Sequence, residues 1–311
     1  MGTYRILALD GGGIRGLLTA VLLRRLEEKV PGWLGKVDLI AGTSTGGILA
    51  LSLARGLSPA ELQKLYYEQC KVIFNDSWKD NLFDLGQIVG AQYSSLNLAR
   101  VIEEFVGPVT LGELNKNVLI SSFDLDNNDK NRLKRSWKPK FFQNFHGKGN
   151  DRDRLARDVA LYTSAAPSYF PAVDGFVDGG VIANNPSMAA LAQVFDERVV
   201  IPNRPNLNEV RLLSVGTGKQ LNYIKTGRKK YLDCGFAQWA QPLLEIMLDG
   251  SMGLADYQCQ QLLGKEQYRR TNPVLTKSIG LDACNKTDDL IRIGERHNVN
   301  DIVTWLKAEW M

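Results

Sequence analysis

The sequence predicts an α/β fold with a central, mostly parallel sheet flanked by helices. Short apolar runs that are typical of buried strands alternate with longer segments in which apolar residues recur at helical spacing. This alternation is typical of a parallel sheet covered by helices on both faces. At 311 residues, with 44% hydrophobic and 23% charged residues, the chain is long enough to bury a full core. We therefore expect a single domain over residues 1–311.

The first strand and the first helix are separated only by a glycine loop. In "YRILALDGGGIRGLLTAVLLRRL" (residues 4–26) an apolar strand leads into three consecutive glycines and then into a helix expected over residues 17–30. A loop without side chains at the start of a helix exposes backbone N–H groups near the positive end of the helix dipole. The loop therefore predicts a site for either a phosphate or an oxyanion.

The second strand leads into a candidate nucleophile. After the strand "KVDLIAG" (residues 36–42), the residues Gly42, Ser44 and Gly46 satisfy the pattern G-x-S-x-G at the start of a helix. Between a strand and a helix this pattern makes a sharp turn that pushes the serine hydroxyl outward. Ser44 is therefore the candidate nucleophile. The plainer interpretation is a glycine and serine turn that caps a helix.

The later elements are marked by caps and by changes in composition. Ser58, Pro59 and Glu61 form an N-cap, a first-turn proline and a capping-box partner for a helix that extends to Phe74. Residues 75–150 are rich in Asn, Asp, Lys and Gly, and we interpret them as an insertion and loops around one strand. Further elements are expected as a strand over 117–125, helices from about 153 and after 186, a strand over 209–218, and a mainly helical part over 221–311.

A serine nucleophile needs a base, and the sequence offers two kinds. Asp178 in "GFVDGG" lies between an apolar strand end and two glycines, where a partly desolvated carboxylate can accept a proton directly. Taken alone, an Asp-Gly pair is also typical of a β-turn. The alternative is a triad of Ser44, Asp178 and His297 in the order of α/β-hydrolases. Those folds place the nucleophile after several strands, whereas Ser44 follows only the second strand. The other histidine, His146, lies in a polar loop.

Three ordered motifs resemble those of the patatin-like phospholipases, a family of serine lipid acyl hydrolases related in fold to the catalytic domain of cytosolic phospholipase A2. The motifs are "DGGGIRG" at 10–16, "GTSTGG" at 42–47 and "DGG" at 178–180. Supporting motifs are "TSAAPSYFP" at 163–171, "NNP" at 184–186 and "SVGTG" at 214–218. The resemblance covers about residues 4–220 and implies a three-layer fold.

The resemblance implies a calcium-independent hydrolase of phospholipase A or lysophospholipase type. Asp178 takes the proton of Ser44 as it attacks a fatty ester, the N–H groups of Gly12 and Gly13 hold the oxyanion, and water hydrolyses the acyl-enzyme. Arg15 either contacts a phosphate head group or braces the loops. The residues that would shape the turns are Gly11, Gly16, Gly42, Gly46, Gly179 and Gly180. The acyl pocket is expected from residues 75–150.

Two other functions stay open, namely a histidine-triad esterase and a catalytically silent lipid-binding protein. A dinucleotide-binding function for the glycine loop is disfavoured, because the second strand has no acidic residue at its end to hold a ribose. No zinc or calcium ligand set is present, so we expect no cofactor. The four widely spaced cysteines suggest no disulfide framework.

Charge and hydropathy narrow the expected partners. The net charge is +4, and basic residues cluster at 130–140, at 225–230 and at Arg269 and Arg270. These clusters are either solvated loops or sites of attraction to an anionic bilayer. The apolar stripe in 236–254 is either core or a bilayer-docking face. We expect an acyl-lipid substrate, peripheral membrane association, no nucleic acid partner and a cytoplasmic location, since neither a signal segment nor an apolar run of about 20 residues is present.

Overall fold

A seven-stranded sheet lies at the centre of the computed structural model, which describes residues 2–73, 93–225 and 235–311. The strand order is β10-β8-β1-β2-β3-β4, and β6 also pairs with β3. Strands β1, β2, β3, β8 and β10 are parallel, whereas β4 and β6 run antiparallel to β3. The bounds are β1 Tyr4–Leu9, β2 Leu39–Thr43, β3 Asn117–Asp124, β4 Lys138–Gln143, β6 Phe176–Asp178, β8 Val210–Val215 and β10 Tyr268–Thr271.

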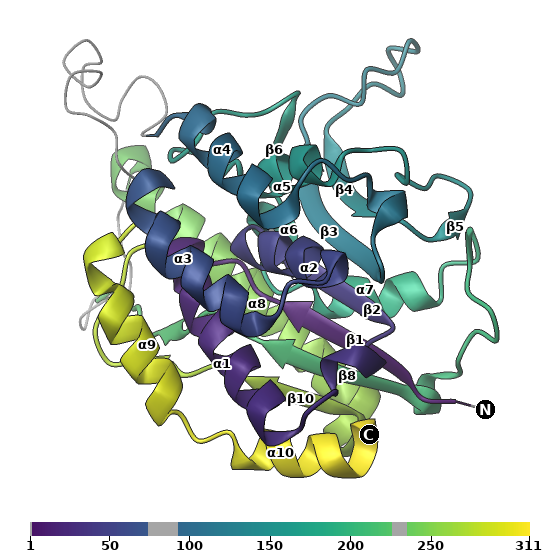
Figure 1. Cartoon of the computed structure of the whole chain (residues 1–311). Helices are drawn as coiled ribbons and strands as arrows, with labels where there is room; N and C mark the ends of the chain where they lie inside the picture. The colour runs from purple at the N-terminus through teal and green to yellow at the C-terminus, as the bar shows by residue number, and fades with distance from the viewer. Residues whose placement is uncertain (1, 74–92, 226–234) are drawn as a thin grey trace.

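Helices cover both faces of this sheet, which gives three layers (Figure 1). One layer contains α1 Gly16–Lys29, α2 Thr45–Arg55, α3 Pro59–Ile73, α4 Ser95–Val106, α5 Ala156–Ser164, α9 Thr287–Arg296 and α10 Asn300–Trp305. The other layer contains α7 Ser187–Val194 and α8 Phe236–Gln267, and α6 Gly180–Ala183 follows β6. The mostly parallel α/β fold that the sequence predicts is therefore confirmed.

Burial on both faces explains why the central strands are apolar throughout. Along β1, Leu7 packs into the core under the α1 layer, and Ile6 packs into the core under α7 and α8. Both side chains are fully buried. Successive residues of a strand point to opposite faces, so a strand covered on both faces needs apolar residues at every position.

Short elements connect the main ones. The helical turns are η1 Gly13–Arg15, η2 Leu34–Lys36, η4 Leu111–Glu113, η5 Leu207–Glu209, η6 Cys284–Lys286 and η7 Leu306–Trp310. Two small sheets pair β5 His146–Gly147 with β7 Val199–Val200, and β9 Lys219–Gln220 with β11 Val274–Leu275. None of the described helices combines the length and hydropathy that a bilayer crossing requires.

The predicted start of α3 is confirmed in detail. The N–H of Ser58 donates to Glu61 Oε2 at 2.8 Å, and the N–H of Glu61 donates to Ser58 Oγ at 3.3 Å. This reciprocal pair satisfies two of the N–H groups that the first turn of a helix leaves without partners.

Two expectations need correction. Residues 75–150 contain α4 and β4 in addition to the expected strand β3; residues 74–92 of that region lie outside the described residues. The part over 221–311 contains α8, α9 and α10, and it also supplies the edge strand β10. In the basic cluster at 225–230, residues 226–230 lie outside the described residues, while Lys225 is exposed.

The second correction concerns the cysteines, because Cys70 and Cys284 form a disulfide. Cys70 lies near the end of α3 and Cys284 begins η6, and their Cα atoms are 5.8 Å apart despite a sequence separation of 214. Both α3 and α9, which follows η6, pack against α1, and this shared packing brings the two cysteines together. Cys259 is buried and unpaired. The disulfide removes one of the arguments for a reducing compartment.

Candidate active site

Ser44 lies in a strained turn between β2 and α2. Its φ of 55° and ψ of −126° are unusual for a residue with a side chain. The turn is tight, because a Cβ added to Gly42 would lie 2.2 Å from the carbonyl oxygen of Gly46. The N–H of Ser44 donates to Thr163 Oγ1 at 2.8 Å, which fixes the turn from α5. This geometry is that of a nucleophile elbow.

Strand register explains why Asp178 meets Ser44. β2 pairs with β3 as far as Thr43 opposite Ser121, and β6 pairs with the next part of β3, with Asp178 opposite Ser122. β4 pairs along one side of β3, and β2 and β6 pair along its other side, one after the other. Since β2 is parallel and β6 antiparallel to β3, they run toward each other. Their carboxyl-terminal ends therefore meet, which brings the two sequence-predicted residues together.

The Asp178 carboxyl is buried, and burial raises its pKa to about 6. Two hydrogen bonds oppose this shift: one from the Ser44 side chain and one from the N–H of Gly180, which donates to Asp178 Oδ1 at 2.7 Å. Desolvation disfavours the charged carboxylate and so makes it a stronger base. A carboxylate with this pKa is deprotonated at neutral pH and can accept the serine proton.

The glycine loop passes directly beside Ser44. The N–H of Gly11 donates to the carbonyl of Asn184 at 2.9 Å, and the N–H of Ile14 donates to the carbonyl of Leu281 at 2.7 Å. Between them, the N–H groups of Gly12 and Gly13 donate to no acceptor within the described residues. Both glycines line the same pocket as Ser44. Two unpaired amides next to a nucleophile are the arrangement of an oxyanion hole.

The lack of side chains in the loop follows from close packing. A Cβ added to Gly11 would lie 2.2 Å from Asn184 Oδ1, and one added to Gly12 would lie 2.2 Å from Thr217 Oγ1. Gly13 has a φ of 57°, and its added Cβ would lie 2.2 Å from the carbonyl oxygen of Leu281. Any side chain would displace the loop from the pocket.

A buried ion pair anchors the start of the loop. Arg270 on β10 donates to the Asp10 carboxylate at 3.1 and 2.5 Å and to Ser214 Oγ at 2.5 Å. The Asp10 side chain is 0% exposed and that of Arg270 is 11% exposed. Sequence analysis grouped Arg270 with exposed basic residues, and that placement is wrong. Its partner lies 260 residues away, so no local pattern revealed the pairing.

Thr163, Asn184 and Thr217 also support the site, although sequence analysis assigned them no role. Thr163 Oγ1 donates to the carbonyl of Ser121 at 2.6 Å while it accepts from Ser44. Thr217 Oγ1 donates to the carbonyl of Gly11 at 2.8 Å. Each residue lies in one of the supporting motifs of the family resemblance, at 163–171, 184–186 and 214–218. Membership in these motifs is the sequence signal that could have identified them.

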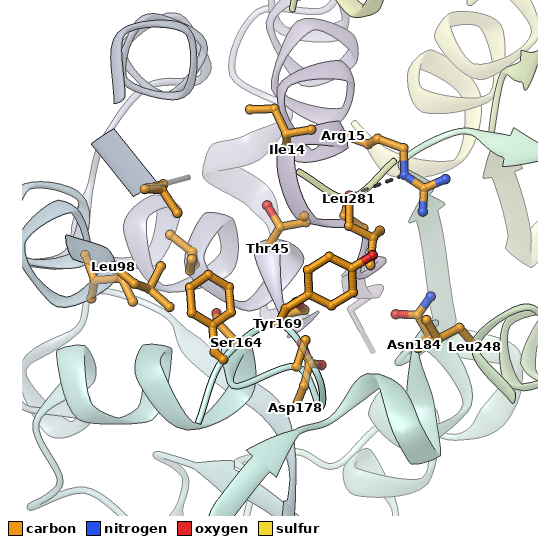
Figure 2. Close-up of a pocket in the computed structure, with 18 of the residues that line it drawn as sticks. Ile14, Arg15, Thr45, Leu98, Ser164, Tyr169, Asp178, Asn184, Leu248 and Leu281 are labelled. Carbon is orange, nitrogen blue, oxygen red and sulfur yellow. Dashed lines mark hydrogen bonds between the residues drawn. The ribbon is translucent and has the colours of Figure 1, made fainter. Parts of the chain in front are cut away.

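Arg15 is a buried cation beside the pocket. It is 7% exposed, and its Nε donates to the carbonyl of Gly12 at 3.3 Å. Among the described residues no carboxylate lies within ion-pair distance, although Asp249 and Glu245 are close enough to favour its charge. Burial lowers the pKa of Arg15. Figure 2 shows the guanidinium group on the side of the pocket that carries Leu248 and Asn184.

The pocket itself is largely apolar (Figure 2). Its apolar walls come from α2, α3, α4, the segment after α5, and α8. The large side chains from these elements are Ile48, Tyr66, Ile73, Leu98, Val101, Ile102, Phe105, Tyr169, Phe170, Leu244 and Leu248, and Ile14 of η1, Val181 of α6 and Leu281 also line the pocket. Of the region 75–150, which we expected to build the pocket, α4 is the part that lines it within the described residues. The other walls come from elements outside that region.

Neither histidine lies in this pocket. His297 follows α9, and its Nε2 lies 3.0 Å from Thr271 Oγ1 on β10. His146 is exposed on β5 and pairs with Val200. The structure therefore does not assemble the triad of Ser44, Asp178 and His297.

Comparisons with known proteins match this chain to phospholipases and patatin-like proteins. The family model described as patatin-like phospholipase matches residues 7–191. A cGAMP-activated phospholipase from Pseudomonas aeruginosa is 31% identical over 96% of this chain and 86% of its own length. Patatin-like protein 2 from Arabidopsis thaliana is 30% identical over 81% of this chain and 70% of its own. The solved human GIVD cytosolic phospholipase A2 aligns with 99% of this chain and 60% of that one, at 12% identity and a TM-score of 0.44.

Proposed function

The chain belongs to the patatin-like phospholipase family of lipid ester hydrolases, and we propose that it cleaves fatty-acyl esters of membrane phospholipids with a Ser44–Asp178 dyad. One observation carries this proposal. The Ser44 side chain faces the buried Asp178 carboxyl, beside two unpaired amides and an apolar pocket. These are the parts that acyl transfer through a serine requires.

The reaction has two steps. As Ser44 Oγ attacks the ester carbonyl, its proton moves to Asp178, and the N–H groups of Gly12 and Gly13 stabilise the oxyanion. Collapse of the tetrahedral intermediate expels the alcohol, which recovers a proton from Asp178 and leaves an acyl group on Ser44. Water then attacks the acyl-enzyme while Asp178 accepts its proton. Collapse of the second tetrahedral intermediate releases the fatty acid and Ser44 Oγ, which recovers that proton from Asp178.

Two further parts of the proposal concern the substrate and the cation requirement. The Nη atoms of Arg15 have no protein hydrogen bond in the described part of the chain and lie beside the pocket. We assign them to the head-group phosphate, while the apolar walls hold the acyl chain. In this mechanism the backbone N–H groups stabilise the oxyanion and no metal ion is needed, so hydrolysis should continue in EDTA. A strict calcium requirement would contradict this part.

The decisive experiment measures fatty acid release from phosphatidylcholine micelles and hydrolysis of a soluble p-nitrophenyl ester. Both assays are run with and without cGAMP, because the relative from Pseudomonas aeruginosa is named as cGAMP-activated. Ser44→Ala and Asp178→Asn should each lower kcat by at least about a thousandfold on both substrates.

Three control variants separate the competing explanations. Ser164 also lines the pocket, and its buried Oγ has no hydrogen-bond partner among the described residues, so Ser164→Ala tests the other candidate serine. His146→Ala and His297→Ala test the histidine esterase. All three should keep nearly full activity. Loss of activity in His297→Ala with an intact fold would replace the dyad by a triad, and inactivity of the parent protein on every ester would indicate a lipid-binding function.

A further inference from the structure

The connection between β3 and β4 leaves the sheet at the edge that carries the active site. Residues 125–137 form this connection, which we call the β3–β4 loop. The glycine loop follows β1, Ser44 follows β2 and the β3–β4 loop follows β3, and these three strands are parallel neighbours. Their carboxyl ends share one edge of the sheet. Figure 1 shows the loop extending from the body of the molecule.

The β3–β4 loop presents large apolar side chains to solvent. Leu133 is 96% exposed and Trp137 is 72% exposed. Residues 130–139 are all exposed, so neither side chain rests on the body of the protein. Isolated exposed apolar residues are ordinary. A leucine and a tryptophan on one projecting loop at an active-site edge are instead typical of an element that enters a lipid interface.

Basic side chains surround these two residues. Lys130, Arg132, Lys134 and Lys138 are exposed, and in the described part of the chain none of them has a carboxylate within 4 Å. Arg135 is different, because it pairs with Asp126. Within the described residues these four cations outnumber Asp129, the acidic residue of the loop that has no ion pair, so the loop stays positively charged. A positive charge around exposed apolar side chains complements a surface of anionic lipid head groups.

Side-chain hydrogen bonds give the tip a defined shape. The N–H of Asn128 donates to Asp126 Oδ1 at 3.0 Å, and the N–H of Leu133 donates to Asn131 Oδ1 at 3.0 Å. Asn127 Nδ2 donates to the carbonyl of Lys134 at 2.9 Å, which ties the two sides of the loop together. Such Asx turns form without a partner. The loop therefore holds its apolar residues outward before it meets a membrane.

The exposed apolar residues of α8 suit an anionic bilayer less well. Leu243 and Met247 are 48% and 43% exposed, but Glu245 and Asp249 are exposed on the same helix. Trp239, one of the residues of the stripe that the sequence left as either core or docking face, is only partly exposed. Acidic residues oppose contact with anionic lipid, so the charge pattern favours the β3–β4 loop.

We propose that the β3–β4 loop docks the protein on anionic phospholipid bilayers, with Leu133 and Trp137 inserted among the lipids and the basic residues on their phosphates. Docking in this orientation turns the edge that carries Ser44 toward the membrane. The proposal adds a binding surface to the proposed function and does not depend on the identity of the nucleophile.

The test measures sedimentation of the full chain with vesicles of phosphatidylcholine alone or with phosphatidylserine at a 3:1 ratio. Ser44→Ala is the background, so that hydrolysis does not alter the vesicles. Leu133→Ala with Trp137→Ala should weaken binding at least tenfold. Replacing Lys130, Arg132 and Lys134 by Gln should remove most of the preference for phosphatidylserine, at about fivefold per residue.

A matched control removes an exposed apolar residue and a cation elsewhere. Val200 is 60% exposed on β7, and Lys148 is exposed beside β5. Val200→Ala with Lys148→Gln should bind like the parent. Without the Ser44 substitution, the loop variants should keep hydrolysis of the soluble ester, which keeps failure of docking separate from failure of the proposed chemistry.

A second measurement does not rely on loss of binding. Lipids with brominated acyl chains should quench fluorescence in the parent, and this quenching should largely disappear in Trp137→Phe, which still binds. Unchanged vesicle binding in the loop variants, an equal loss in the control, or equal quenching in Trp137→Phe would each overturn the proposal.

Discussion

Asp178 is buried and accepts a hydrogen bond from the Ser44 side chain, so its protonation controls the proposed reaction. Burial raises the pKa of Asp178 to about 6, although the bonds from Ser44 and Gly180 oppose this shift. The base is active when deprotonated. Activity should therefore fall as the pH drops through the pKa of Asp178, and a surface aspartate would give the same fall about two pH units lower.

The first prediction is a pH profile for hydrolysis of the soluble ester. kcat/KM should rise about tenfold per pH unit below about pH 6 and become flat above about pH 7, because kcat/KM reports the free enzyme. Circular dichroism at each pH confirms that the fold persists. A fall in kcat/KM centred near pH 4 would contradict Asp178 as the base. A fall near pH 6 that disappears in His297→Ala would indicate an imidazole base.

The second prediction separates the two roles of Arg15. If its Nη atoms contact the head-group phosphate, Arg15→Met should lower kcat/KM for phosphatidylcholine by about 10- to 100-fold, the usual range for a charge-assisted hydrogen bond. Hydrolysis of the soluble ester, which has no phosphate, should change by less than about threefold. Equal losses on both substrates would instead show that the bond from Arg15 to Gly12 braces the loop.

Among the elements, β10 links the carboxyl-terminal part of the chain to the candidate active site. Its Arg270 is the partner of Asp10, the residue that precedes the glycine loop. Removing one member of a buried ion pair leaves an uncompensated charge, which costs far more than loss of an exposed pair. The neighbouring Arg269 pairs with Asp301, whose side chain is 79% exposed, and so provides a matched control.

The third prediction compares these two arginines by urea unfolding. Arg270→Met should lower the free energy of unfolding by about 3–5 kcal/mol, whereas Arg269→Met should change it by at most about 1 kcal/mol. Asp10→Asn combined with Arg270→Met should recover part of the loss, because no charge remains buried. Similar effects of the two single substitutions would contradict the anchoring role.

β10 is one of the elements that could not be predicted from the sequence. The glycine loop and Ser44 were predicted because local turns between strand and helix require particular residues at fixed spacing. "YRRT" has no such pattern, and within the described residues its buried cation pairs with Asp10, which directly follows the first strand. α4 was missed because its amphipathic sequence lies within a polar region. The contact between Ser44 and Asp178 follows from the shared edge of β3, and strand register is invisible in one sequence.

For the molecule as a whole, the Cys70–Cys284 disulfide joins α3 to the segment that carries Leu281. The carbonyl of Leu281 accepts from Ile14, so this segment also supports the glycine loop. Cross-linking residues so far apart removes many conformations of the unfolded chain and is worth about 2–5 kcal/mol. The cross-link therefore stabilises the wall of the active site together with the fold.

The fourth prediction is a redox dependence of thermal stability. Dithiothreitol should lower the melting temperature of the parent protein, and Cys70→Ser with Cys284→Ser should melt at that lower temperature with or without reductant. Cys259→Ser is the control, because that thiol is unpaired. An equal melting temperature of the parent with and without dithiothreitol would contradict a stabilising disulfide.

The same disulfide divides the chain into a covalent ring, from Cys70 to Cys284, and two tails. Ser44 and the glycine loop lie on the first tail, whereas Asp178 lies on the ring. A single protease cut at the exposed Arg132 opens the ring but releases no fragment. The nicked protein should migrate as one species on a gel without reductant and as two with it, so that the serine and its proposed base remain covalently joined after the backbone between them is broken.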